Sequence, residues 1–229
     1  MKNIISLFII LFSLSTLAQE VSRATITEMA KRNHVALSYQ DVKKVLFSTV
    51  ENIDGVVCSV YTPSQCQKRY YKDPTELEIK RAEQGFNLNI EHTWPQSKGA
   101  KELPANSDMH HLFVTSKESN SKRANLPFCN AEYDYWQMDG SIYGFDQFSQ
   151  DCFEPQDLHK GNVARAMFYF SIRYNLPIDE DQEVTLRAWH KLDPVDNREL
   201  ERNEIIRAIQ GNSNPFITNP EFINIIRDY

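Results

Sequence analysis

The longest apolar run of this sequence lies at the N-terminus, and it constrains the compartment in which the rest of the chain must fold. Met1-Lys2-Asn3 is short and basic, residues 4–14 are almost wholly apolar, and the small residues Thr16 and Ala18 precede Gln19. This layout is typical of a secretory signal peptide cleaved after Ala18, with a buried N-terminal helix as the alternative. No other stretch is long and apolar enough to span a bilayer. We therefore expect export to the periplasm or the medium, without stable membrane association after cleavage.

Residues 19–229 have the length of one sizeable globular domain, and no repeat or linker divides them. The whole chain has a net charge of −6, and removal of Lys2 with the signal leaves −7. Such acidity argues against a polyanionic partner unless positive charge is concentrated locally. Five basic residues do lie close together in the sequence: Lys98, Lys101, Lys117, Lys122 and Arg123.

The chain contains four cysteines, Cys58, Cys66, Cys129 and Cys152. In an exported protein an even number indicates disulfides, and four cysteines allow three pairings. We predict Cys58–Cys66 and Cys129–Cys152, because each of these pairings closes a local loop. A zinc site is the alternative, but the sequence has no C-x-x-C pair to favour it.

Apolar periodicity and turn residues predict an α+β domain. We expect strands over residues 56–61, 87–92 and 109–114, helices over 39–52, 116–125 and 162–174, and a long ordered loop over 130–153. Asp41 is the predicted cap of the first helix. A further helix is expected to follow a capping box of Asp196 and Glu199 and to end at Gly211.

Residues 91–125 concentrate the groups that phosphodiester hydrolysis requires. A neutral histidine is the natural base near pH 7, and this segment contains His92, His110 and His111. A hard cation such as Mg²⁺ prefers oxygen ligands, which the Glu91 carboxylate and the Asn120 amide can supply. The expected order of strand, loop, strand and helix would present these groups along one short stretch of chain.

The same segment resembles the endonuclease I family of periplasmic and secreted nucleases, which carry a ββα-metal motif of the His-Me finger type. Any single piece of the resemblance is weak, but the order and spacing of all pieces over residues 88–217 are specific. The pieces are Glu91-His92 with Pro95, Ser107-Asp108-Met109-His110, Glu118 with Asn120, Arg123 and Asn125, Gly161-Asn162 with Arg165, Phe168-Tyr169-Phe170, and the stretch from Arg207 to Phe216.

The resemblance implies a ββα-metal core wrapped by helices and a non-specific endonuclease that leaves 5′-phosphate ends. DNA is the implied substrate, with RNA as a second candidate, and the protein is expected to be a monomer. His92 would be the general base, and Glu91 and Asn120 would hold the metal, Mg²⁺ first, with Mn²⁺ and Ca²⁺ as alternatives. Phosphate-binding or supporting roles would fall to six residues: Arg123, Lys98, Lys101, Asp108, His110 and Asn125.

Glu91 and His92 can serve one site only if their strand ends or bulges there, because neighbouring residues of a regular strand point to opposite faces. Pro95 is consistent with such an ending. The chain also departs from the family pattern, since the better-known members carry a phosphate-contacting Arg between the two halves of the motif. This sequence has a shorter link without Arg, and Lys cannot copy a bidentate guanidinium contact.

Two alternatives remain open from the sequence. A zinc hydrolase would use His92, His110 and His111 as ligands, and tightly bound metal would identify it. A catalytically inactive nucleic-acid-binding protein of the same fold would lack nicking activity. Other residues have a structural alternative to a role in the site. Asp108 could form a buried pair with the histidines that follow it, and Arg165 and Arg173 could serve only in packing.

Overall fold

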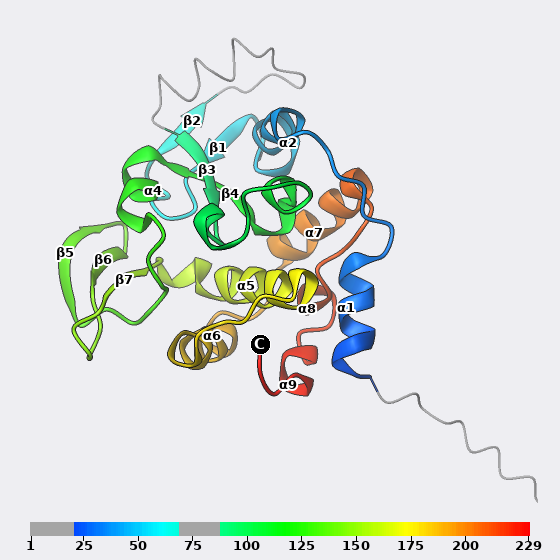
Figure 1. Ribbon diagram of the computed structural model, residues 1–229. Helices are drawn as coiled ribbons and strands as arrows, with labels where there is room; N and C mark the ends of the chain where they lie inside the picture. Colours follow the sequence, from blue (N-terminus) through cyan, green and yellow to red (C-terminus); the bar gives the residue numbers. More distant parts are fainter. Residues whose placement is uncertain (1–20, 69–87) are drawn as a thin grey trace, which may run out of the picture.

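The computed structural model describes residues 21–68 and 88–229 (Figure 1), so the predicted signal peptide at residues 1–18 lies outside the described residues. The described strands all lie within residues 56–154, with helices mainly before and after them, and this segregation agrees with the α+β prediction. The strands are β1 (Val56–Cys58) paired with β2 (Cys66–Lys68), β3 (Leu88–His92) paired with β4 (Leu112–Ser116), and the sheet of β5 (Tyr133–Met138), β6 (Ser141–Phe145) and β7 (Asp151–Glu154).

Eight α-helices are present in the described residues. Their bounds are α1 (Arg23–Lys31), α2 (Tyr39–Val45), α4 (Lys117–Arg123), α5 (Lys160–Tyr174), α6 (Glu180–Leu192), α7 (Asn197–Gln210), α8 (Pro215–Thr218) and α9 (Phe222–Ile225). Within residues 21–68 and 88–229, none of these helices has the length and apolarity needed to cross a membrane.

Helix α5 lies in the middle of the molecule, with α6 alongside it and α1 close to its C-terminal end (Figure 1). Nearly every residue of α5 is buried, including Arg165 and Arg173. The periodicity predicted a helix that buries one apolar stripe, whereas α5 is covered by other elements on all of its faces. Both arginines are accommodated because each meets a buried carboxylate: Glu199 for Arg165 and Asp108 for Arg173.

The β3–β4 pair and the following α4 form the ββα unit that the sequence predicted. The strands are antiparallel, with Glu91 opposite Phe113 and His92 opposite Leu112. The second strand starts at Leu112 rather than at residue 109, because the Asp108 side chain accepts a hydrogen bond from the His110 N–H (3.2 Å) and caps a short 3₁₀ turn. Apolar residues beneath this unit form a core cluster with α2 and α7: Val42, Leu46, Ile90, Leu112, Val114 and Ile206.

The prediction of a long loop over residues 130–153 is wrong, because this region forms the sheet β5–β6–β7. Asp139 and Gly140 join β5 to β6 with φ values of 51° and 89°. These left-handed values are those of a two-residue hairpin turn, for which Asp-Gly is a favoured sequence. The register shifts between Asp134 and Trp136, and this bulge interrupts the alternation by which a strand is recognised in a sequence.

Other element ends also differ from the predictions. The helix expected over residues 39–52 is α2 followed by a π-helical turn (Leu46–Val50), and its cap is Ser38, whose Oγ accepts from the Asp41 N–H (3.1 Å). Asp196 caps α7 and Gly211 ends it, as predicted. The Glu199 side chain binds Arg165 and so does not complete the expected capping box.

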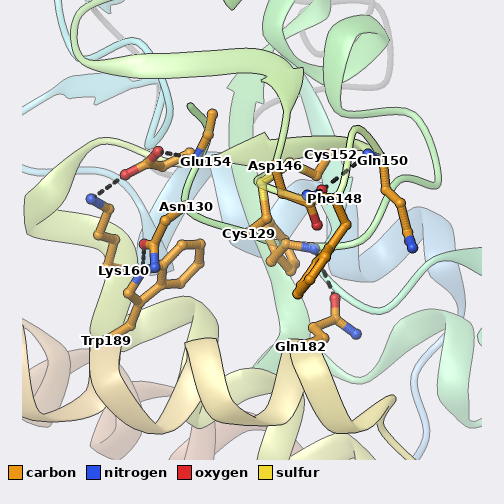
Figure 2. The surroundings of a disulfide bond; sticks show 12 residues. Cys129, Asn130, Asp146, Phe148, Gln150, Cys152, Glu154, Lys160, Gln182 and Trp189 are labelled. Carbon is orange, nitrogen blue, oxygen red and sulfur yellow. Dashed lines mark hydrogen bonds and ion pairs between the residues drawn. A yellow bond between two sulfur atoms is a disulfide. The ribbon is translucent and has the colours of Figure 1, made fainter. Parts of the chain in front are cut away.

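Both predicted disulfides, Cys58–Cys66 and Cys129–Cys152, are present. The first closes the turn between β1 and β2, and β1 therefore stops at Cys58 instead of residue 61. The second joins the segment after α4 to β7. Helix α6 lies next to this disulfide (Figure 2), and its Gln182 side chain accepts a hydrogen bond from the Phe128 N–H (2.8 Å). The two crosslinks fit an exported protein.

Removing the second crosslink with Cys129→Ser and Cys152→Ser should lower the free energy of unfolding by about 3.5 kcal/mol, because its sequence separation of 23 restricts the unfolded chain. The matched control is Cys58→Ser with Cys66→Ser, whose separation of 8 predicts a smaller loss of about 2.5 kcal/mol. Urea unfolding measures both. Four free thiols detected by mass spectrometry in the exported, active protein would contradict the pairing.

Candidate active site

Glu91, His92 and Asn120 line one surface depression of about 350 Å³, located where β3 ends and α4 passes. Strand β3 stops at His92, so two neighbouring side chains can reach the same pocket without a bulge. The chain then turns into the segment that begins at Thr93, whose N–H donates to the His111 carbonyl (3.0 Å). The prediction that the strand ends at Glu91-His92 is therefore confirmed.

The hydrogen bonds of His92 define its tautomer. Its Nε2 lies 3.2 Å from the carbonyl oxygen of Asn106, and a carbonyl only accepts, so Nε2 carries the proton. The amide nitrogen of Gln96 lies 3.3 Å from Nδ1 and 3.2 Å from Nε2. With the proton on Nε2, Nδ1 is the acceptor nitrogen of the ring, and the Gln96 amide is the donor within reach of it.

The surroundings of His92 keep its ring neutral. The ring is 8% exposed and lies 5.6 Å from the Tyr39 ring and 5.5 Å from the His111 ring, between centroids. Burial, and secondarily His111, lower the pKa of His92 to about 3, although the Asn106 carbonyl opposes this. At neutral pH His92 therefore has one unprotonated ring nitrogen and no charge.

Glu91 is 2% exposed, and two buried side chains contact its Oε1. The Tyr61 hydroxyl donates to this oxygen (3.1 Å), and Nε of Arg123 lies 3.0 Å from it. Burial raises the pKa of Glu91, and the Arg123 charge opposes that rise. Among the described residues, Oε2 has no hydrogen-bond donor.

Asn120 is oriented by the backbone of β3. Its Nδ2 donates to the Ile90 carbonyl oxygen (3.1 Å), so its Oδ1 remains available as an acceptor. The helix that carries it is set by Ser116, whose Oγ accepts from the Ser119 N–H (3.1 Å). The pocket thus brings the Glu91 carboxylate and the Asn120 amide oxygen together with the His92 imidazole.

The supporting residues predicted from the sequence occupy different environments. Arg123 is 1% exposed and also donates to the Thr93 carbonyl (2.8 Å), so it supports Glu91 and is not an open phosphate contact. Asn125 lines the pocket and binds Ser97 Oγ (3.3 Å). The exposed Lys98 and Lys101 lie on the loop beside the pocket and do not line it.

Asp108 and the two histidines after it are buried and do not line the pocket. Nε2 of His110 donates to the Asn212 carbonyl (2.9 Å), and Nε2 of His111 donates to the Ala105 carbonyl (2.8 Å). Burial lowers the pKa of both histidines to about 4. No group of three His, Cys, Asp or Glu side chains in residues 21–68 and 88–229 could hold a metal ion, so the zinc alternative has no support there.

Sequence reasoning missed three residues that contact the predicted groups: Tyr61 on Glu91, and Gln96 and Tyr39 beside His92. Gln96 lies four residues after His92 and could have been considered. Tyr61 lies 30 residues before Glu91, and no local pattern connects the two. Its position inside the predicted Cys58–Cys66 loop was the one available signal.

A protein-family model described as Endonuclease I matches residues 18–221 of the chain. The chain is 32% identical to an extracellular ribonuclease of Bacillus subtilis (strain 168) over 214 residues, an alignment that covers 84% of this chain and 69% of the relative. It is 37% identical to an extracellular deoxyribonuclease of Aeromonas hydrophila over 115 residues, covering 48% of each chain. A periplasmic deoxyribonuclease of Aeromonas hydrophila is 35% identical over 125 residues, covering 52% of this chain and 51% of the relative.

Asp108→Asn should lower the free energy of unfolding by about 3–5 kcal/mol, because it leaves the buried Arg173 without its charge partner. Both carboxylate oxygens accept from donors, so an amide nitrogen would face another donor in either orientation. Burial raises the pKa of Asp108, but Arg173 and His110 outweigh it and hold the pKa below its usual range. The stabilisation is therefore present above about pH 4 and declines as the pH falls below it.

Chemical denaturation at pH 7 and pH 3 measures this effect, and the gap between wild type and variant should narrow at the lower pH. The exposed Asp134 on β5 provides the control, since Asp134→Asn should change stability by less than about 0.5 kcal/mol. A similar small change for Asp108→Asn would contradict its structural role.

Proposed function

The chain belongs to the endonuclease I family, as its motifs predicted, and on that premise we propose that it is an exported, metal-dependent endonuclease. It would hydrolyse phosphodiester bonds of DNA and RNA without reading sequence. Relatives named as ribonuclease and as deoxyribonuclease support both substrates. The disulfides and the extracellular or periplasmic names of these relatives support export.

One observation carries the proposal: an uncharged imidazole, whose Nδ1 is its unprotonated nitrogen, shares a small pocket with a carboxylate and an amide oxygen that could bind a metal. His92 would accept the proton of the attacking water at Nδ1, because the Asn106 carbonyl keeps the proton of the ring on Nε2. The 3′ oxygen would leave and the phosphate would remain on the 5′ side. The β3–β4–α4 unit would then be the ββα-metal core.

The donor set fits a hard divalent cation, with Mg²⁺ first and Mn²⁺ or Ca²⁺ as alternatives. Glu91 and Asn120 would hold it through oxygen atoms, as Mg²⁺ prefers, with water and substrate phosphate as the remaining ligands. When bound, the cation supplies positive charge for the phosphate and for the departing oxygen. None of the described residues lining the pocket is Lys or Arg, so the cation would be the main source of positive charge for the phosphate.

Substrate binding would rest on phosphate contacts made around the pocket. Lys98 and Lys101 lie on the adjacent exposed loop, and Lys117 and Lys122 lie on α4, the helix that carries Asn120. Contacts of this kind carry no sequence information directly, which supports non-specific cleavage. An inactive nucleic-acid-binding protein of the same fold would bind in the same way, and a plasmid-nicking assay separates the two.

His92→Ala should reduce the nicking rate by at least about 10²–10⁴-fold, the usual contribution of a general base, while nucleic-acid and metal binding persist. Glu91→Ala and Asn120→Ala should instead raise the Mg²⁺ concentration needed for activity. Because His92 is neutral well below pH 6.5, the acid limb of the wild-type rate should lie below the ordinary histidine range. Nicking rates and Mg²⁺ titrations of the purified variants test this.

Near-normal nicking by His92→Ala, or recovery of its activity at high Mg²⁺, would show that His92 is not the base. Added imidazole offers a positive control, since it can fill the vacated space and accept the proton.

The combined substitution of Lys98, Lys101 and Lys122 by Ala should weaken binding to all nucleic-acid sequences alike. Each lost phosphate contact should reduce the slope of log affinity against log salt by about 0.9 on duplex DNA. Fluorescence anisotropy over a salt series measures this, with Lys191→Ala on α6 as the control. A marked preference for one short sequence among the cleavage sites would disprove the non-specific mode.

A further inference from the structure

We propose that Tyr61 is a positioning residue for the metal-binding carboxylate. Its hydroxyl would fix the orientation of Glu91 by holding Oε1, so that Oε2 remains the oxygen offered to the cation. The inference rests on the proposed function, because it gives Glu91 the role of metal ligand. Tyr61 touches neither the cation nor the substrate and acts only through Glu91.

The hydrogen-bond geometry at Glu91 singles out Tyr61. Two groups approach Oε1, the Tyr61 hydroxyl at 3.1 Å and the Arg123 Nε at 3.0 Å. The N–H of Arg123 Nε is not aimed at an acceptor and makes no hydrogen bond, so it contributes charge without direction. Among the described residues, the hydroxyl of Tyr61 is therefore the one directional hydrogen bond on this carboxylate.

Tyr61 is itself held in place on all sides. It is fully buried, and its ring lies 4.9 Å from the Phe153 ring and 5.7 Å from the His159 ring, between centroids. Its carbonyl oxygen accepts from Ser141 Oγ (2.7 Å). The loop that carries it is closed by the Cys58–Cys66 disulfide.

The hydrogen bond from Tyr61 matters because the Glu91 carboxylate can otherwise rotate about its Cγ–Cδ bond. Arg123 balances the charge of Glu91 but does not select one rotation, whereas a hydroxyl on a fixed ring does. Residues that orient metal ligands in this way typically contribute a factor of 10–100 to metal affinity. Tyr61 should therefore govern how tightly the cation binds and have little influence on proton transfer at His92.

Tyr61→Phe removes the hydroxyl and keeps the ring, so the packing against Phe153 should persist. We expect the mature protein with this substitution to bind Mg²⁺ about 10-fold more weakly in isothermal titration calorimetry. The Mg²⁺ concentration for half-maximal nicking should rise by the same factor, and the rate at saturating Mg²⁺ should return to within about twofold of wild type. Tyr135→Phe provides the matched control, because Tyr135 is 61% exposed on β5, and it should leave both quantities unchanged.

A double-mutant cycle separates positioning from a general loss of structure. In a Glu91→Ala background, Tyr61→Phe should change the Mg²⁺ requirement by less than about twofold, because the group on which it acts is gone. An undiminished effect in that background, or a Mg²⁺ affinity of Tyr61→Phe within twofold of wild type, would overturn the role of Tyr61. A wild-type protein that neither binds Mg²⁺ nor nicks plasmid would overturn the proposed function itself.

Discussion

The arrangement of the site depends on the buried Asp108 carboxylate. Its Oδ2 accepts from the Tyr169 and Tyr174 hydroxyls of α5 and pairs with Arg173, while its Oδ1 accepts from Gln210 at the end of α7. Asp108 also caps the turn that leads into β4. One carboxylate therefore connects two helices to the strand that pairs with β3, and this pairing sets the position of His92.

The interior accommodates many charges because each is paired with a fixed partner. Arg165 donates two hydrogen bonds to Glu199, at 2.7 and 2.5 Å, and Arg202 donates to Glu51 at 2.8 Å. An isolated charge in these places would be strongly destabilising, whereas a guanidinium matched to a carboxylate satisfies both groups. In the Arg123–Glu91 pair the carboxylate lines the candidate site, and its hydrogen bond and its ion pair both fall on Oε1.

Local patterns predicted the parts of the fold that depend on neighbouring residues. These include β3 with its end at His92, the helix that carries Asn120, both disulfides and the end of α7 at Gly211. The sheet β5–β7 was missed because its bulge disrupts the alternation on which strand prediction relies. The burial of Arg123 and its contact with Glu91 depend on tertiary packing, so the sequence left its role undecided between phosphate contact and support. Tyr61 was missed for the same reason.

Glu91 and His92 are consecutive residues, and the chain that follows them is anchored on both sides. Thr93 is tied to His111, and the Ala105 and Asn106 carbonyls bind His111 and His92. Residues 101–104 between these anchors are exposed. Doubling the length of a flexible loop costs only about 0.6 kcal/mol. Lengthening or shortening this segment would therefore cost little stability and would change the surface beside the pocket, while Glu91 and His92 stay adjacent because they are consecutive in the chain.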